Sequence, residues 1–203
     1  MRNGTKIANR ARPRGRPREF ITSEVLERVR DVFVAKGFAA ASLDELCAAA
    51  GLNRPSLYSA FGDKEQLYIQ TLRHIGHKGV ESMDAILSRP EPIQKRLGRL
   101  YKGAINLYTA PPHRPGCIIV GTATVESPTH PEIGAVANEL LGNFEKAFER
   151  GFIDSDLKKD PSPADRARRA GAILYATGIR ARWGVQAAEL KAFTDSMIPV
   201  ICR

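Results

Sequence analysis

Apolar residues recur at intervals of three and four along most of this 203-residue chain, the spacing that places them on one face of an α-helix. The pattern breaks at glycines, prolines and short polar runs, which divide the chain into separate helices. We therefore predict an all-α protein. The expected helices are Thr22 or Ser23 to Gly37, 42–50, 53–61, Lys64 to about Gly79, 93–108, one from Pro131 to before the loop of 154–163, 163–183 and 186–201.

One stretch of the chain fits two kinds of secondary structure. Residues 117–125 (CIIVGTATV) are nearly all apolar or small, and a period of two would suit a β-strand. We expect a buried helix here, because the segments on both sides are predicted to be helical.

Helix start and stop signals are densest between residues 42 and 64. Ser42, followed by Glu45 three residues later, forms a capping box, and Gly51 can take the positive φ that ends a helix. Asn53 is a suitable cap for a second helix. Two short helices joined by a turn that contains glycine predict a helix-turn-helix, whose second helix lies in a DNA major groove.

Side chains near the start of that second helix reach DNA first. Arg54 is the strongest candidate for a base contact, because a guanidinium can pair with O6 and N7 of guanine; a phosphate contact is the alternative. Ser42 and Lys64 stand at helix starts, where free backbone N–H groups also favour phosphates. The candidate DNA-binding residues of this segment are Ser42, Asn53, Arg54, Ser56, Tyr58, Ser59 and Lys64.

Positive charge is concentrated at the N-terminus. Residues 1–18 hold seven basic residues and no acidic one, so the rest of the chain carries only two of the nine net positive charges. We predict a disordered basic arm in which Arg14, Arg16 and Arg18 contact DNA. Residues 13–17 (PRGRP) resemble the core of an AT-hook, which inserts arginines into a narrow minor groove. General attraction to phosphates is the alternative, and both predict DNA contact.

From about Arg16 to Tyr68 the sequence resembles the DNA-binding half of the tetracycline-repressor (TetR) family. The matching motifs, in order, are GRPRE (15–19), KGF (36–38), Ala-x-Ser-Leu-Asp-x-Leu (40–46), AGLN (50–53) and Leu-Tyr-x-x-Phe-Gly-Asp-Lys-Glu (57–65). An ordinary helical hairpin of another all-α protein would not match so many positions in order. Where the family often has a second aromatic residue or a histidine, this chain has Ser59 and Ala60, so one of the family's phosphate contacts is not expected.

The resemblance implies three parts: a basic arm over 1–18, a helix-turn-helix domain over 19–64 and an effector-binding and dimerisation domain over 65–203. It also implies that Tyr58 hydrogen-bonds a phosphate, and that the helix beginning at Lys64 carries a ligand signal between the two domains.

The function that the resemblance implies is a ligand-responsive transcriptional regulator, most simply a repressor that a small-molecule effector releases from a palindromic operator. It would act as a homodimer through residues 163–201. Activators exist on this scaffold too, and the sequence names neither the effector nor the operator. The candidate effector-binding residues are Tyr101, Tyr108, Cys117, Phe144, Tyr175 and Trp183, with core or dimer packing as the alternative for each.

Other functional classes find little support. No P-loop, GxGxxG motif or Ser/His/Asp order is present, so we predict neither an enzyme nor a cofactor. His74 and His77 are spaced i, i+3, but no third metal ligand is evident, so no metal site is predicted. An architectural DNA-bending protein is the remaining alternative, and the large, nearly neutral C-terminal body argues against it.

The cellular location is predicted from what the chain lacks. It has no run of 18 apolar residues, and its N-terminus has no apolar segment typical of a secretory signal. We therefore predict a cytoplasmic protein without membrane contact. Cys47, Cys117 and Cys202 are expected to be free thiols, with a redox sensor as the alternative.

Overall fold

A computed structural model describes residues 18–111, 116–158 and 160–203. All regular secondary structure in these ranges is helical, which confirms the all-α prediction. The elements are α1 (Arg18–Ala40), α2 (Leu43–Ala50), α3 (Arg54–Phe61), α4 (Lys64–Leu87), α5 (Ile93–Tyr108), the π-helix η1 (Ile119–Ala123), α6 (Thr124–Glu126), α7 (Pro131–Ile153), α8 (Pro163–Arg182) and α9 (Ala187–Cys202).

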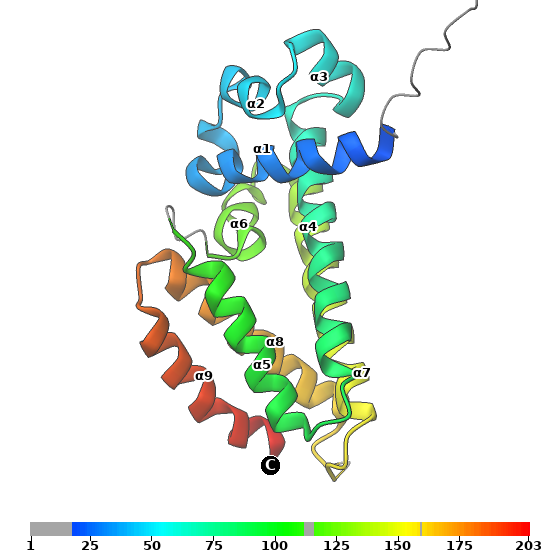
Figure 1. Ribbon diagram of the computed structural model, residues 1–203, viewed down its shortest axis with the longest axis vertical. Helices are drawn as coiled ribbons and strands as arrows, with labels where there is room; N and C mark the ends of the chain where they lie inside the picture. Colours follow the sequence, from blue (N-terminus) through cyan, green and yellow to red (C-terminus); the bar gives the residue numbers. More distant parts are fainter. Residues whose placement is uncertain (1–17, 112–115, 159) are drawn as a thin grey trace, which may run out of the picture.

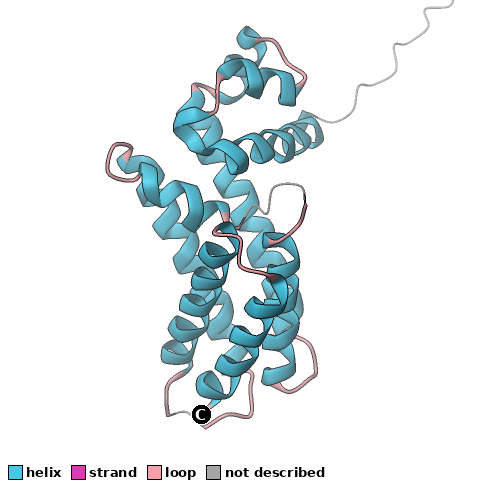
Figure 2. Ribbon diagram, turned by 90° about the vertical axis from the view of Figure 1, so that its left-hand side faces the viewer, coloured by secondary structure: helices cyan, strands magenta, loops and turns pink. Residues whose placement is uncertain are grey.

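Helices α1, α2 and α3 pack together at one end of an elongated molecule, and α4 runs from this three-helix unit along the body (Figure 1). The other long helices form a bundle below the unit, as the perpendicular view shows (Figure 2). Phe33, Leu46, Leu57 and Phe61 form the centre of the three-helix unit and are each at most 3% exposed. No helix within the described ranges is both long enough and apolar enough to cross a membrane.

The predicted caps of the helix-turn-helix are present. Ser42 accepts a hydrogen bond from the backbone N–H of Glu45, and the Glu45 carboxylate accepts one from the backbone N–H of Ser42. Gly51 ends α2 with φ 67°. Asn53 caps α3 by accepting from the Ser56 N–H at 2.9 Å. These local interactions set the angle between α2 and α3 before any distant contact is considered.

Two predicted helix boundaries are wrong. α1 begins at Arg18 rather than at Thr22 or Ser23, because the sequence after Pro17 offers no glycine or proline before Gly37 to interrupt a helix. The predicted break at Gly37 is confirmed: within the range given for α1, this residue has φ 78° and ψ 178°, so the regular helix is interrupted there.

α4 continues to Leu87 instead of ending near Gly79. Gly76 and Gly79 lie against α7: a Cβ at Gly76 would come within 2.5 Å of Leu140, and one at Gly79 within 3.0 Å of Phe144. These glycines therefore permit close packing of α4 on α7 instead of ending the helix.

The stretch that fitted either a strand or a helix is helical. Residues 119–123 form the π-helix η1, and residues 124–126 form α6. π-helical turns are rare and often occur at functional positions. Thr122, which is 3% exposed, hydrogen-bonds the hydroxyl of Tyr68 on α4, so η1 is joined to the helix that leads out of the three-helix unit.

The small residues of α8 are used largely inside the chain. A Cβ at Gly178 would lie 2.7 Å from the Cβ of Cys117, and one at Gly171 would lie 3.2 Å from Glu145. α8 therefore approaches α7 and the segment after residue 116 closely. Any contact of α8 with a second subunit has to use its other side.

Candidate nucleic-acid interface and ligand cavity

Helix α3 turns one side to the core and the other to the surface. Leu57 and Phe61 are 2% and 3% exposed, whereas Asn53, Arg54, Ser56, Tyr58 and Ser59 are all exposed. The side chains that sequence spacing assigned to DNA thus share the outer surface of α3. This arrangement fits a helix that enters a major groove with its N-terminal residues foremost.

Arg54 is held by an acidic residue of the preceding helix. Its Nη2 and Nε donate to Asp44 Oδ1 at 2.7 and 3.1 Å, and both side chains are more than half exposed. Exposed ion pairs contribute about 0–1 kcal/mol, whereas a bidentate contact to guanine contributes about 1–3 kcal/mol. Asp44 therefore positions the Arg54 guanidinium, but their ion pair is weak enough to be exchanged for a contact with guanine.

The two helix-start residues differ in how accessible they are. Ser42 is exposed beside its capping partner Glu45. Lys64 donates to the Ala39 carbonyl at 3.1 Å and lies 4.8 Å from the Phe38 ring centre, and its partial burial lowers the pKa of its ammonium group. A phosphate contact from Lys64 requires the side chain to leave this position. Arg14 and Arg16 lie outside the described residues, and Arg18 is the first residue of α1.

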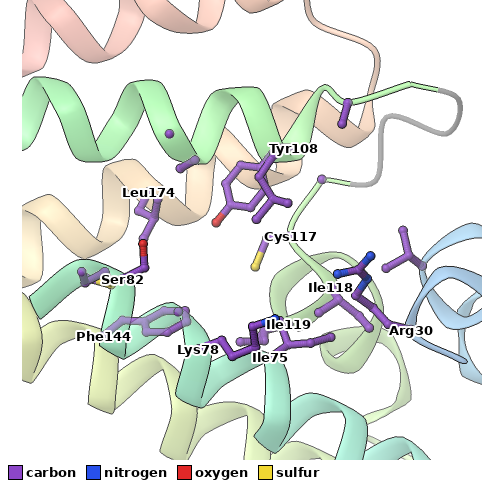
Figure 3. A pocket seen from close by; sticks show the side chains of 18 of the residues that line it. Arg30, Ile75, Lys78, Ser82, Tyr108, Cys117, Ile118, Ile119, Phe144 and Leu174 are labelled. Carbon is purple, nitrogen blue, oxygen red and sulfur yellow. The ribbon is translucent and has the colours of Figure 1, made fainter. Parts of the chain in front are cut away.

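A cavity of about 530 Å³ lies between the three-helix unit and the bundle. Its wall comes from α1, α4, α5, α7, α8 and the segment 116–119, and Figure 3 shows side chains from these elements around one space. A volume of this size suits a small organic molecule. Its lining residues include Glu27, Arg30, Lys78, Ser82, Ala104, Tyr108, Cys117 and Phe144.

Two buried groups of the cavity wall, Cys117 and Tyr108, are uncharged. Burial raises the pKa of the Cys117 thiol, an effect that hydrogen bonds from the Val120 and Ile119 backbone and the Tyr108 side chain only partly offset. Burial likewise raises the pKa of the Tyr108 phenol well above its usual value. Both groups are protonated at neutral pH and can act as weak donors to a ligand. The Cys117 thiolate that would be needed for nucleophilic attack is correspondingly scarce.

Charged residues line the cavity where it meets α1. Glu27 on α1 accepts from Lys78 Nζ at 2.5 Å and from Arg30 Nη1 at 2.6 Å, and it lies 3.0 Å from His74 Nε2. Because Lys78 and His74 belong to α4, one carboxylate joins α1 to α4 at the edge of the cavity. Desolvation alone would raise the pKa of Glu27, but these hydrogen bonds and the charge of Arg30 hold it below its ordinary value.

A lowered pKa means that the charged carboxylate stabilises the folded protein at pH values above its unfolded pKa, and that this contribution disappears as the pH falls through the folded pKa. Glu27→Gln should therefore lower the free energy of unfolding by about 1–2 kcal/mol at pH 7 and have a smaller effect near pH 4. Urea denaturation at the two pH values measures this. Glu81→Gln is the matched control, because the exposed Glu81 carboxylate lies 3.3 Å from the exposed His77 of the same helix, α4. Equal losses in the two variants would contradict the α1–α4 link.

Half of the predicted effector-binding residues line this cavity. Tyr108, Cys117 and Phe144 do so. The structure places the other three elsewhere: Tyr101 donates to the Ala170 carbonyl in the core, Tyr175 donates to the Leu141 carbonyl, and Trp183 is 78% exposed.

Sequence reasoning missed the walls from α1 and α4. On α4, the lining residues Ile75, Gly79, Ser82 and Ile86 follow one another at helical spacing. That stripe of apolar and small residues was the available signal. On α1, the charged Glu27 and Arg30 resembled an ordinary solvated surface, so nothing in the sequence marked them as cavity residues.

Further contacts connect the three-helix unit and the start of α4 with the bundle. His130 Nδ1 lies 3.0 Å from Glu65 Oε2, and the His130 ring packs edge-on against Phe38. Glu126 accepts from the Ala39 N–H at 3.4 Å. Among the described residues, no three histidine, cysteine or acidic side chains come together as a possible metal site.

Comparisons with known proteins bear on both the exposed surface of α3 and the cavity. The family model described as "Bacterial regulatory proteins, tetR family" matches residues 25–71, from α1 into α4. The HTH-type transcriptional repressor BdcR of Escherichia coli (strain K12) is 32% identical over 151 residues, which are 74% of this chain and 73% of BdcR. This chain belongs to the TetR family.

Structural similarity extends over both halves of this TetR-family chain. A cysteine mutant of the TetR family transcriptional regulator CifR, complexed with 26-bp double-stranded operator DNA, is 26% identical with a TM-score of 0.71, and the alignment covers 93% of this chain and 98% of CifR. The HTH-type transcriptional activator FasR of Mycolicibacterium smegmatis is 38% identical over 60 residues, 29% of this chain and 27% of FasR. The TetR-family chain is thus a DNA-binding transcriptional regulator, and, as predicted, not an enzyme.

Proposed function

We propose that this TetR-family regulator is a repressor that binds a palindromic operator as a homodimer and leaves it when a small molecule occupies the cavity of Cys117 and Tyr108. The observation that supports this most directly is that α1 forms part of the cavity wall. A molecule in the cavity therefore touches the helix that braces α2 and α3, with no intermediate element required.

The energetic requirement is a difference in affinity. A ligand changes DNA binding only if it binds the DNA-incompetent conformation more tightly, and DNA must then weaken ligand binding by the same factor. Glu27 lies where such a difference can arise, because it joins α1 to α4 through Lys78 at the edge of the cavity. A ligand that prefers a different α1–α4 spacing shifts the position of α3 with α1.

Repression rather than activation is favoured by the relatives. BdcR, named as a repressor, aligns with 74% of this chain, whereas FasR, named as an activator, aligns with 29%. The similarity to BdcR therefore extends well beyond the DNA-binding segment into the part of the chain that holds the cavity.

Operator recognition is proposed to follow from two copies of α3. A twofold homodimer through residues 163–201 would present two such helices about 34–36 Å apart, one helical turn of DNA. The outward residues Asn53, Arg54, Ser56, Tyr58 and Ser59 of each copy would contact one half-site, with Ser42 and, once released from Ala39, Lys64 on the flanking phosphates.

Arg54→Ala tests whether α3 reads bases. We expect specific operator affinity to fall by about 1–3 kcal/mol per half-site, because the fork that pairs with guanine is lost, while binding to random DNA falls less. Gel shifts at matched salt on operator and scrambled duplexes measure both. Asp44→Asn is the control, since it removes the same ion pair but keeps the guanidinium. Equal losses on the two duplexes would assign Arg54 to a phosphate.

Deletion of residues 1–17 tests the basic arm. The segment contains six basic residues and no acid, so its removal should weaken binding to all duplexes and flatten the dependence of log affinity on log salt by about 0.9 for each phosphate that the arm neutralises. Titrations of full-length and truncated protein at several salt concentrations give the two slopes. An unchanged slope would show that the arm makes no phosphate contact.

A further inference from the structure

The start of α8 lies at the end of the molecule opposite α3 (Figure 1), and the first turn of α8 contains a buried arginine, Arg166. Arg166 is 1% exposed. Its Nη1 donates to the Pro161 carbonyl, but its Nε and Nη2 have no hydrogen-bond partner among the described residues. Since a guanidinium stays charged at all ordinary pH values, this is a buried cation with most of its donors unused.

The neighbourhood supplies no buried anion to balance it. Within the described ranges, every buried charged side chain is an arginine: Arg166 and Arg96, which also has an unpartnered Nε. A buried charge without a partner is strongly unfavourable, so proteins that keep one usually place a counter-charge or a ligand beside it.

A second cavity, of about 330 Å³, adjoins this arginine. Among the described residues, Arg166 and Lys158 contribute cationic side chains, and Phe152, Leu157 and Pro163 contribute apolar wall. Pro163 is also the first residue of α8, so the positive end of a 20-residue helix lies at the same place. Because Ser162 caps this helix start and Asp165 lies in its first turn, the positive charge at the cavity comes mainly from Arg166 and Lys158.

We propose that this cavity binds a phosphate group, carried either by inorganic phosphate or by a small phosphate monoester. Two cationic side chains match a dianion better than a monocarboxylate, and the planar guanidinium can hold two phosphate oxygens at once. The unused Nε and Nη2 of Arg166 are buried, so binding requires the outer part of this side chain to rotate toward the cavity that it lines. The apolar wall leaves room for the organic part of a monoester.

The site is separate from the cavity of Cys117 and Tyr108. Phosphate bound here would stabilise the junction of α7 and α8 and the loop between them, whatever the effector is. Asp156 is the anion of the chain that competes with phosphate for Arg166. The charge of Asp156 raises the pKa of the Cys202 thiol and the charge of Arg166 lowers it, so both side chains lie near Cys202. If Asp156 swings inward to pair with Arg166, no ligand is needed.

Thermal unfolding of the full chain distinguishes these possibilities. At matched ionic strength, inorganic phosphate at ten times its Kd should raise the Tm of the wild type by roughly 3–6 °C over chloride, and acetate should not. Glycerol phosphate in place of inorganic phosphate then shows which carrier binds more tightly. Absence of any phosphate-specific rise in the wild type would overturn the proposal.

Variants locate the effect. Arg166→Met should lose the phosphate-dependent rise yet be at least as stable as the wild type in chloride, because a buried unpaired charge has been removed. Lys158→Ala, an exposed position, should weaken the response, and Arg168→Met, which removes an exposed arginine paired with Asp165, should keep it. A response that survives in Arg166→Met would place the phosphate elsewhere, such as at α3. If both Arg166→Met and Asp156→Asn are less stable than the wild type in chloride, Arg166 forms an ion pair with Asp156, and the proposed phosphate site is contradicted.

Discussion

Trp183→Asp is expected to convert the regulator into monomers at micromolar concentration and to lower its operator affinity by about 100-fold or more. Trp183 follows α8 directly and is 78% exposed, and Val200 on α9 is 44% exposed. Tryptophan is enriched at protein interfaces, so an exposed Trp183 on the helix pair that is predicted to dimerise is the side chain most suited to burial by another subunit. Burial of a carboxylate there is unfavourable, and a monomer contacts only one half-site.

Sedimentation velocity measures the first effect and gel shifts measure the second. Val125→Asp is the matched control, because Val125 is 72% exposed but lies on α6, outside residues 163–201. Trp183 is also the only tryptophan of the chain, so in wild-type protein its fluorescence should shift to shorter wavelength as the concentration rises through the dimer dissociation constant. A Trp183→Asp protein that sediments as the wild type does would refute dimerisation through this surface.

The helix-turn-helix could be predicted from sequence because its signals are local. The capping box of Ser42 and Glu45, the left-handed Gly51 and the Asn53 cap each act within three or four residues, and each is present. The outward position of Arg54 follows from helical spacing relative to Leu57 and Phe61. No distant part of the chain had to be known for any of these predictions.

Predictions failed where a distant helix decides the outcome. Gly79 appeared to end a helix, yet α4 continues through it. This glycine instead leaves room for Phe144 of α7, which occupies the space that a side chain would need. The π-helical form of residues 119–123 was likewise not predicted. In this segment, Thr122 forms a hydrogen bond with Tyr68, a residue 54 positions away, and no local sequence pattern predicts that contact.

The cavity shows the same limit. Aromatic residues were selected as cavity candidates by type, which identified Tyr108 and Phe144 but also Tyr101 and Tyr175, whose hydroxyls are taken up by backbone carbonyls of neighbouring helices. The walls from α1 and α4 depend on how the three-helix unit sits on the bundle. That placement is set by contacts between segments far apart in sequence, such as His130 with Glu65.

Ala104→Phe should abolish the response to effector while leaving operator binding in place. Ala104 lines the cavity from α5 and is half-buried, so a phenyl group at this position projects into space that a ligand would use. Overpacking of a filled core typically costs about 1–3 kcal/mol, but here the added ring meets a cavity of about 530 Å³. The fold should therefore tolerate the change, and α3 is untouched.

The anionic dye 1-anilinonaphthalene-8-sulfonate serves as the probe of occupancy, since the fluorescence of its aromatic rings rises in an apolar cavity. Wild-type protein should enhance the dye, and Ala104→Phe should not. Ala135→Phe is the control, because Ala135 is exposed on α7 and lies outside the cavity lining. Undiminished dye binding by Ala104→Phe would mean that this cavity does not admit ligands. Loss of operator binding together with loss of dye binding would mean that filling the cavity itself moves α1, which is the displacement proposed for the effector.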